Sequence, residues 1–304
     1  FNTLFNRLSI LNKNFQLSVH HHYYNTNDIS LHRMGDVIIS LENTSAFKTN
    51  KNVAFNMSFC PVGYNQNNYL VNVNLFKETQ HSKYVLSFHF SDKKPDFFRL
   101  NPLDQNYRGW NSFLSVNTIF LNLKSIWNTR NIITEFSCNR YANYMYFNEL
   151  AYPTQATQTI AYFNFRLQKK WYFNNLSIQS ALSAQHFNTE LLSLPKILYH
   201  QKIQYNMNLF EDVIFNASLN SYLFSNYYPN AFLPLMDVFY HQFETKSKIT
   251  PFTSFDLFLS KERFRIGFIV DNINSFFMKE NYFVPSYFLP NTTVRMSLKW
   301  TFLD

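Results

Sequence analysis

Glycine, cysteine and charged residues are all scarce in this chain, and long apolar runs are missing. Only 15% of its 304 residues are charged although 46% are hydrophobic, whereas soluble proteins usually carry about 25% charged residues. No apolar run of about 18 residues occurs, which excludes a transmembrane helix. The two cysteines, Cys60 and Cys138, can form at most one disulfide, so we interpret them as small strand side chains and expect no redox or metal site.

With four glycines, the chain must form most of its tight turns with another residue. Asparagine is the next residue that tolerates the left-handed backbone region. We therefore predict turns built on asparagine. The candidates are Asn12-Lys13-Asn14, Asn65-Gln66-Asn67-Asn68 and Asn174-Asn175.

What the sequence has instead is alternation of apolar and polar residues, which predicts β-strands with two different faces. The clearest case is residues 293–304. One parity there holds Val294, Met296, Leu298, Trp300 and Phe302, and the other holds Arg295, Ser297, Lys299 and Thr301. The pattern recurs from Phe15 to Val270 and predicts roughly 14–16 strands, an even number being expected of an outer-membrane barrel.

Aromatic residues make up 19% of the chain, which suits the aromatic girdles of a membrane barrel. Candidate girdle residues are Trp171, Tyr172, Phe173, Tyr222, Tyr227 and Tyr228, with ordinary core aromatics as the alternative. We predict an all-β fold: a single closed antiparallel transmembrane β-barrel, formed by one domain over residues 1–304. A soluble all-β binding protein with its apolar faces inside is the alternative.

The sequence also predicts how the strands are connected. Short turns are predicted at Lys169-Lys170, Phe210-Glu211 and Ser260-Lys261-Glu262, and a wall strand at Met236–Glu244. Longer connections are predicted at 151–159, 187–195, 227–234 and 274–290. Within 96–127, Phe113 to Trp127 fits both periods; a strand with a bulge is favoured, and a helix or inserted loop is the alternative.

A C-terminal signature carries a family resemblance over roughly residues 169–304. Its matching positions are Tyr287, Pro290, Arg295, Trp300 and Phe302, supported upstream by Leu194-Pro195, Tyr227-Tyr228 and Phe239-Tyr240 with Gln242. In these positions the chain resembles the putative porin family of the Bacteroidota. It departs from the family at Phe288, Asn291, Thr292 and Ser297, where the family has Pro, Gly, Arg and Gly.

The resemblance implies a bacterial outer-membrane porin that lets small hydrophilic solutes diffuse passively. Its expected partners are outer-membrane lipids, the solutes, and the barrel-assembly machinery acting through the C-terminal strand. A barrel that does not conduct and has a structural or assembly role is the alternative. Because the chain begins at Phe1 without Met, we expect a trimmed sequence without its signal peptide, and leave open whether an N-terminal segment is absent too.

Basic residues dominate the polar parity of several strands. Lumen-lining candidates are Arg166, Lys202, Arg263, Arg265, Arg295 and Lys299. These side chains either stiffen the wall by hydrogen bonding or form a cationic lining that favours anions. The net charge is +8, but the basic residues are scattered, so we do not expect nucleic-acid binding.

Catalytic and metal sites are not predicted. His20 and His22 share a strand face, but no third ligand lies nearby in sequence, so polar lumen lining is favoured over a metal site. Ser, His and Asp are plentiful without forming a recognisable catalytic motif. We expect no enzymatic activity and no cofactor.

Overall fold

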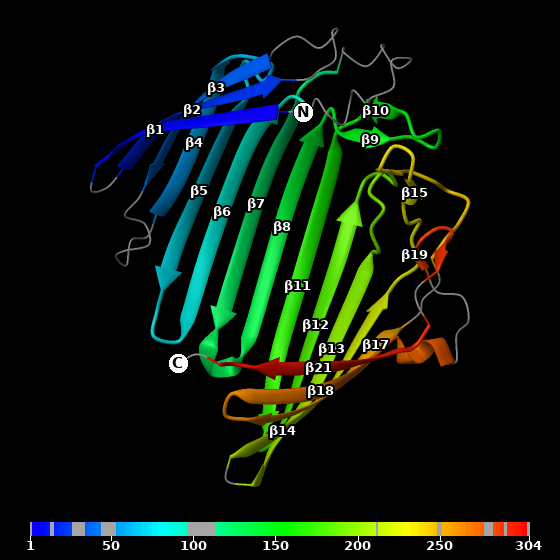
Figure 1. Cartoon of the computed structure of the whole chain (residues 1–304). Helices are drawn as coiled ribbons and strands as arrows, with labels where there is room; N and C mark the ends of the chain where they lie inside the picture. The colour runs from blue at the N-terminus through cyan, green and yellow to red at the C-terminus, as the bar shows by residue number, and fades with distance from the viewer. Residues whose placement is uncertain are drawn as a thin grey trace.

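The computed structural model describes residues 2–12, 15–25, 34–43, 53–95, 113–210, 212–247, 251–276, 282–288 and 291–302. Its main feature is one antiparallel sheet of 15 strands in which neighbours in space are neighbours in sequence (Figure 1). The strands of this sheet are β1 (Asn2–Leu11), β2 (Phe15–Asn25), β3 (Met34–Asn43), β4 (Val53–Val62), β5 (Tyr69–Glu78), β6 (Ser82–Lys93), β7 (Val116–Trp127), β8 (Ile132–Ala142), β11 (Ile160–Phe173), β12 (Leu176–Phe187), β13 (Ile197–Phe210), β14 (Val213–Phe224), β17 (Phe252–Lys261), β18 (Phe264–Asp271) and β21 (Thr293–Trp300).

The sheet turns its apolar side outward. Phe165 is 45% exposed, and it pairs across the sheet with Phe136 and Ala184 on the same outer face. Among the described residues, Ile160 is the one large aliphatic side chain that is fully buried. The alternative of a soluble protein with its apolar faces packed inside therefore does not fit this structure, because a soluble fold buries such side chains in a core.

The two ends of the sheet differ. At one end, the short-turn end, the connections 12–14, 79–81, 128–131, 174–175, 211–212 and 262–263 are short, although 44–52 is longer. At the other, the long-loop end, the connections 94–115, 143–159, 188–196, 225–251 and 272–292 are long, although 26–33 and 63–68 are shorter. The long-loop end carries three small hairpins, β9 (Met145–Phe147) with β10 (Pro153–Gln155), β15 (Ala231–Leu233) with β16 (Val238–Tyr240), and β19 (Tyr282–Val284) with β20 (Tyr287–Phe288).

Asparagine takes the left-handed positions of several turns. Asn67 has φ 70° and Asn174 has φ 47°, which confirms two of the predicted turns. Asn131 and Asn143 lie in the same region, with φ of 50° and 55°. The third predicted turn includes residues 13 and 14, which are outside the described residues.

The ambiguous segment after Phe113 is a strand. Residues Val116–Trp127 form β7, which pairs with β6 and β8 without a register shift. The strand prediction is thus confirmed and the bulge is wrong, because continuous pairing on both sides leaves no unpaired residue. Residues 96–112 lie outside the described part.

Two other sequence predictions are wrong, and one wall strand was not predicted. Lys169-Lys170 is no turn, since β11 continues to Phe173 with the two ammonium groups 5.7 and 4.7 Å from the ring centres of Trp171 and Tyr172. Met236–Glu244 is not a wall strand, because only Val238–Tyr240 is extended and it pairs with β15. β1, which the alternation pattern did not single out, forms the first wall strand.

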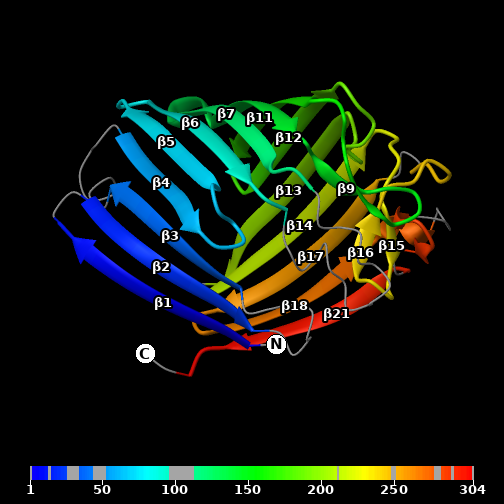
Figure 2. The ribbon, with the colours of Figure 1, turned by 90° about the horizontal axis from the view of Figure 1, so that it is seen from above.

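The first and last strands are the free edges of the sheet. The prediction of an even strand number is wrong for the described sheet, which has 15. With an odd number of antiparallel strands, β1 and β21 run in the same direction, from the long-loop end to the short-turn end. Figure 2 shows the sheet curving until both edges reach the same side of the molecule, but no pairing joins them among the described residues.

Candidate functional site: the inner face of the sheet

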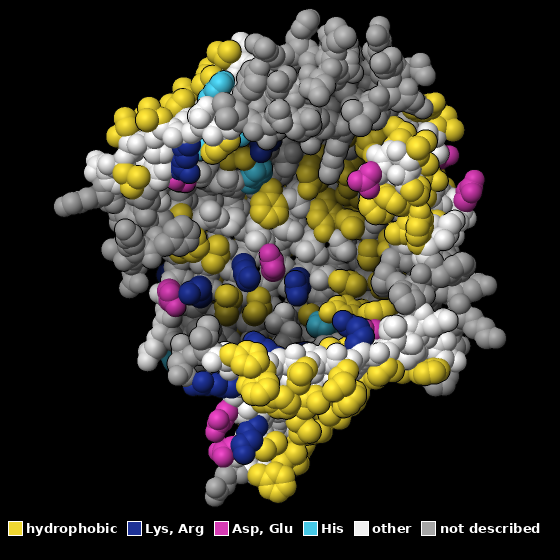
Figure 3. Space-filling view, viewed as in Figure 1, with side chains coloured by type: hydrophobic (Ala, Val, Ile, Leu, Met, Phe, Trp, Pro, Cys, Tyr) yellow, Lys and Arg dark blue, Asp and Glu magenta, His cyan; other side chains and the backbone are white. Residues whose placement is uncertain are grey.

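Strand register defines which side chains share the concave inner face. Directly opposite residues on paired strands point to the same side of a sheet. One such row of partners runs across seven strands: Glu42, Asn56, Asn72, His89, Phe120, Asn139 and Tyr162. Figure 3 looks into the hollow that this face surrounds, and Lys, Arg, Asp and Glu side chains are visible on its wall.

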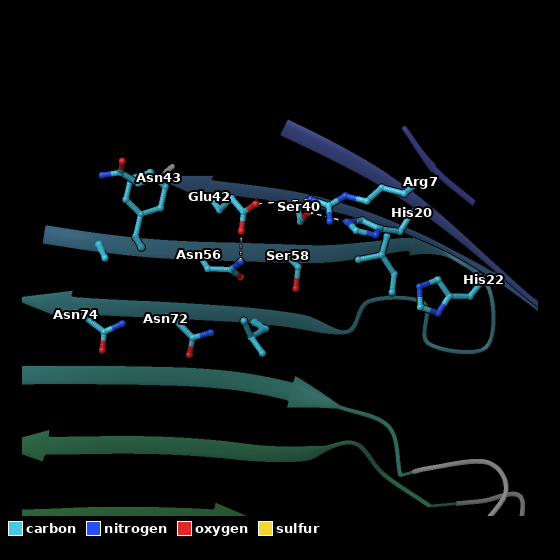
Figure 4. Close-up of a pocket in the computed structure, with 14 residues that line it drawn as sticks. Arg7, His20, His22, Ser40, Glu42, Asn43, Asn56, Ser58, Asn72 and Asn74 are labelled. Carbon is cyan, nitrogen blue, oxygen red and sulfur yellow. Dashed lines mark hydrogen bonds and ion pairs between the residues drawn. The ribbon is translucent and has the colours of Figure 1, made fainter. Parts of the chain in front are cut away.

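A first cavity, the Arg7 pocket, lies over β1 to β5 and measures about 690 Å³ (Figure 4). Arg7 Nη2 lies 3.7 Å from Glu42 Oε1, and His20 Nε2 lies 3.1 Å from Ser40 Oγ. Both ion-pair side chains are partly exposed, and pairs of this kind add little stability. The charges of Arg7 and Glu42 nevertheless offset each other, so this part of the wall is close to neutral.

A second cavity, the Asn139 pocket, lies over β5 to β11 and measures about 570 Å³. It shares Asn72 and Asn74 with the Arg7 pocket. Its lining residues are Asn72, Asn74, Ser87, Phe88, His89, Thr118, Phe120, Ser137, Asn139, Tyr141 and Tyr162. None of them is Lys, Arg, Asp or Glu, so the lining consists of amides, hydroxyls, rings and one imidazole.

The predicted lumen-lining residues of the strands all fall on the inner face. Arg166 lies opposite Glu135, four residues further along β11 than Tyr162. Lys202 lies opposite Gln179 and Asn220. The remaining strand positions are Arg265 opposite Ser260 and Lys299, and Arg295 opposite Ile269. Arg263 lies in the turn between β17 and β18.

These cations differ in their partners. Arg295 is paired, because its Nη2 lies 2.6 Å from Asp271 Oδ2. The guanidinium carbon of Arg265 lies 3.9 Å from the centre of the Phe258 ring, a cation–π contact. Within the described part of the chain, no carboxylate lies within 4.0 Å of Arg166, Lys202 or Lys299, so their charge is available to a solute.

The C-terminal signature does not form a single site. Tyr287 lies in the β19–β20 hairpin at the long-loop end, with its ring centre 5.9 Å from that of Phe232. Trp300 lies at the short-turn end, stacked on Phe302 with ring centres 4.9 Å apart. Arg295 lies on the inner face between them, and Pro290 is outside the described residues.

The predicted girdle residues divide into two groups. Trp171, Tyr172 and Phe173 are exposed at the short-turn end of β11, as are Trp127, Phe210 and Trp300 on other strands. An interface position suits these residues better than a core position. Tyr222, by contrast, stacks on His200 at 4.3 Å on the inner face, and Tyr227 and Tyr228 lie in the β14–β17 connection.

The histidines of β2 alternate between the two faces of the sheet. His20 and His22 lie on the inner face with ring centres 6.5 Å apart, while His21 has the opposite parity. Within the described ranges, no cluster of three or more His, Cys, Asp or Glu side chains could hold a metal ion. Cys60 is buried, Cys138 is half-buried, and both are free thiols.

A loop cluster at the long-loop end was not predicted by the alternation pattern. His241 is 4% exposed there; its backbone N–H donates to Phe147 O at 2.8 Å, and its Nδ1 lies 3.3 Å from Ser193 Oγ. Burial lowers the pKa of His241, and the nearby carboxylates of Glu149 and Glu190 partly oppose this shift. No periodic pattern marks such a residue, because its contacts come from separate connections.

Known structures share this fold. The chain is similar to the ferric enterobactin receptor PfeA, solved in complex with BCV-L6, with TM-score 0.62, 11% identity, and coverage of 98% of this chain and 53% of that one. The siderophore receptor PirA from Acinetobacter baumannii gives TM-score 0.60 and 9% identity, with coverage of 99% and 54%. At these identities the likeness concerns the fold alone, and this chain spans about half the length of either receptor.

The helices of the described residues are short turns, and none is long and apolar enough to span a membrane. No curated protein matches this sequence. The family model described as "Putative porin" matches residues 2–304. Because this model covers nearly the whole chain, the chain belongs to the putative porin family.

Proposed function

We propose that this protein is a porin of the bacterial outer membrane through which small hydrophilic solutes diffuse passively. The observation that carries the proposal is the division of one sheet into an exposed apolar outer face and a polar, hollowed inner face. Such a sheet suits lipid outside and water inside. The proposal requires neither a catalytic group nor a cofactor.

The proposal includes closure of the sheet into a barrel. Backbone N–H and C=O groups on a free edge have no partner in hydrocarbon, and each unsatisfied group costs several kcal/mol. Because β1 and β21 run in the same direction, antiparallel closure requires one further strand running the opposite way between them. Direct closure would instead create one parallel pair.

The inner face also supports a preference for anions. Arg166, Lys202 and Lys299 face the hollow without a carboxylate partner among the described residues. The acidic Glu42 and Asp271 are paired with Arg7 and Arg295, while Glu135 and Asp256 on the same face accept hydrogen bonds from the neutral Asn122 and Ser218. A lumen with unpaired cations concentrates anions and repels cations.

Planar-bilayer recording tests the proposal. The purified protein, inserted from detergent, should give stepwise conductance, and a KCl gradient should give a reversal potential of the sign expected for Cl⁻ preference. A closed barrel should also migrate faster on an SDS gel before heating than after. A folded protein that inserts but gives no current would instead support a non-conducting barrel, and solubility without detergent would contradict both readings.

A further inference from the structure

The Asn139 pocket stands out because it is uncharged within a cationic lumen. Four residues toward the short-turn end, the same inner face holds Lys124, Glu135 and Arg166 in one row, yet the pocket lining contains no Lys, Arg, Asp or Glu. An ion entering the pocket would leave water without gaining a counter-charge, which is unfavourable. The pocket therefore suits a neutral, polar solute.

Asn139 lines this pocket between two residues that carry rings. Its row partners are Phe120 on β7 and Tyr162 on β11. Asn139 is only 5% exposed, and its amide makes no hydrogen bond with any side chain or backbone group in the described part of the chain. Its amide atoms are open to the hollow that Asn139 lines, so a ligand that supplies both a donor and an acceptor could replace the water there.

Neighbouring groups extend the same chemistry. Asn74 and Ser87 also make no side-chain hydrogen bond within the described residues, and both line the cavity. Asn72 uses its Oδ1 toward His89 Nδ1 at 2.5 Å, which leaves its NH₂ group free to donate. Amides and hydroxyls can both donate and accept, as sugar hydroxyls do.

The rings add a second kind of contact. A pyranose has hydroxyls around its rim and C–H groups on its faces, so it fits a site that alternates amides with aromatic surfaces. Phe120 and Tyr162 offer such surfaces on either side of Asn139. The Tyr162 hydroxyl already donates to Gln185 Oε1 at 2.5 Å, which holds the ring in place.

We propose that the Asn139 pocket is a binding subsite for the ring of an uncharged saccharide. The inference rests on the proposed function only in that solutes reach the inner face. It adds a ligand class that the unpaired cations alone would not suggest. The rest of the inner face would then serve passage, while this pocket would retain the sugar briefly.

Maltotriose serves as the probe, with a polyethylene glycol of similar size as the control solute. In planar bilayers, maltotriose should reduce the conductance in a saturable way, while the glycol should reduce it only in proportion to its concentration. Asn139→Ala should raise the half-blocking concentration about ten-fold, since one or two hydrogen bonds are lost. Asn208→Ala, an exposed inner-face amide on β13 outside the pocket, should leave it unchanged.

Calorimetric titration of the detergent-solubilised protein with maltotriose separates this inference from the proposed function. Saturable heat in a protein that does not conduct would support the subsite and contradict the porin. Conductance without saturable block or heat would overturn the subsite and leave the porin intact. If Asn139→Ala fails to give the heat-modifiable band, Phe120→Leu provides the second variant, and an unchanged affinity in that variant would overturn the role of the rings.

Discussion

The inner face of this sheet consists of two chemically different walls. The neutral wall, over β5 to β8, holds every lining residue of the uncharged Asn139 pocket except Tyr162, and Lys124 and Glu135 on this wall lie opposite each other. The cationic wall, over β11 to β21, holds Arg166, Lys202, Arg265 and Lys299. Both walls share one sheet and one alternation of polar and apolar residues. The difference teaches that alternation determines the fold, whereas the kind of polar residue determines which solute each wall favours.

Charge reversal on the cationic wall should have the largest effect. In Lys202→Glu with Lys299→Glu, the reversal potential in a KCl gradient should shift toward cation preference. A unit charge about 8 Å away in water changes an ion's energy by about 0.5 kcal/mol, so each reversal should change local ion concentrations several-fold. Lys169→Glu on the outer face of β11 is the matched control, and an equal shift there would mean that the walls are not distinct.

Replacing Gly267 by alanine should have the next largest effect, because the added Cβ would collide with Phe258. A Cβ at Gly267 would lie 2.1 Å from Phe258 Cδ1 and 2.9 Å from Leu257 O. Gly267→Ala should therefore destabilise the barrel by about 1–3 kcal/mol, and it should displace Arg265 from the ring. Urea unfolding followed by gel mobility measures the loss.

The double variant Gly267→Ala with Phe258→Ala checks this cause. Removing the ring should make the alanine at position 267 less harmful than it is alone, giving a favourable coupling energy. Additive losses would show that the clash with Leu257 O dominates. In that case the position of Arg265 on the cationic wall would not depend on the ring.

Acidification should have the smallest effect, confined to the loops at the long-loop end. Because burial lowers the pKa of His241, its neutral form is the native one. The stability it contributes is present above the unfolded value of about 6.5 and is lost as the pH falls through the lowered folded pKa. Glu149 and Glu190 reduce the effect by favouring the charged form.

Hydrogen exchange of the His241 amide, which donates to Phe147 O, provides the readout. Protection should fall on acidification in the native protein and become independent of pH over that range in His241→Gln. The protection of amides in the neutral wall should not change with pH over the same range. A pH-dependent change in β7 and β8 as well would show that the loops and the wall act as one unit.

Much of the sheet could be predicted from the sequence, because the period of two is a local property. Val294, Leu298 and Trp300 of the last strand show it without long-range information. Local charge misled the prediction at Lys169-Lys170, where the two ammonium groups lie over aromatic rings and the strand continues.

The pockets depend on register, which the sequence does not show directly. Asn139 lies between Phe120 and Tyr162 only because three strands are aligned in one particular way. A shift of one residue would move each side chain to the other face. The inner-face cations could be predicted because strand parity alone assigns them to a face. The loop cluster around His241 could not, because its residues come from separate connections and follow no periodic pattern.

Asparagine at the left-handed turns has a consequence for how such a sheet tolerates change in its genetic composition. Asn67, Asn131 and Asn174 hold φ of 70°, 50° and 47° where many chains would use glycine. Replacing any of them by glycine should leave the connection almost unaltered, while alanine should strain it by about 1 kcal/mol. A lineage that loses glycine from its proteins can thus keep these hairpins, provided that asparagine occupies the left-handed turn positions.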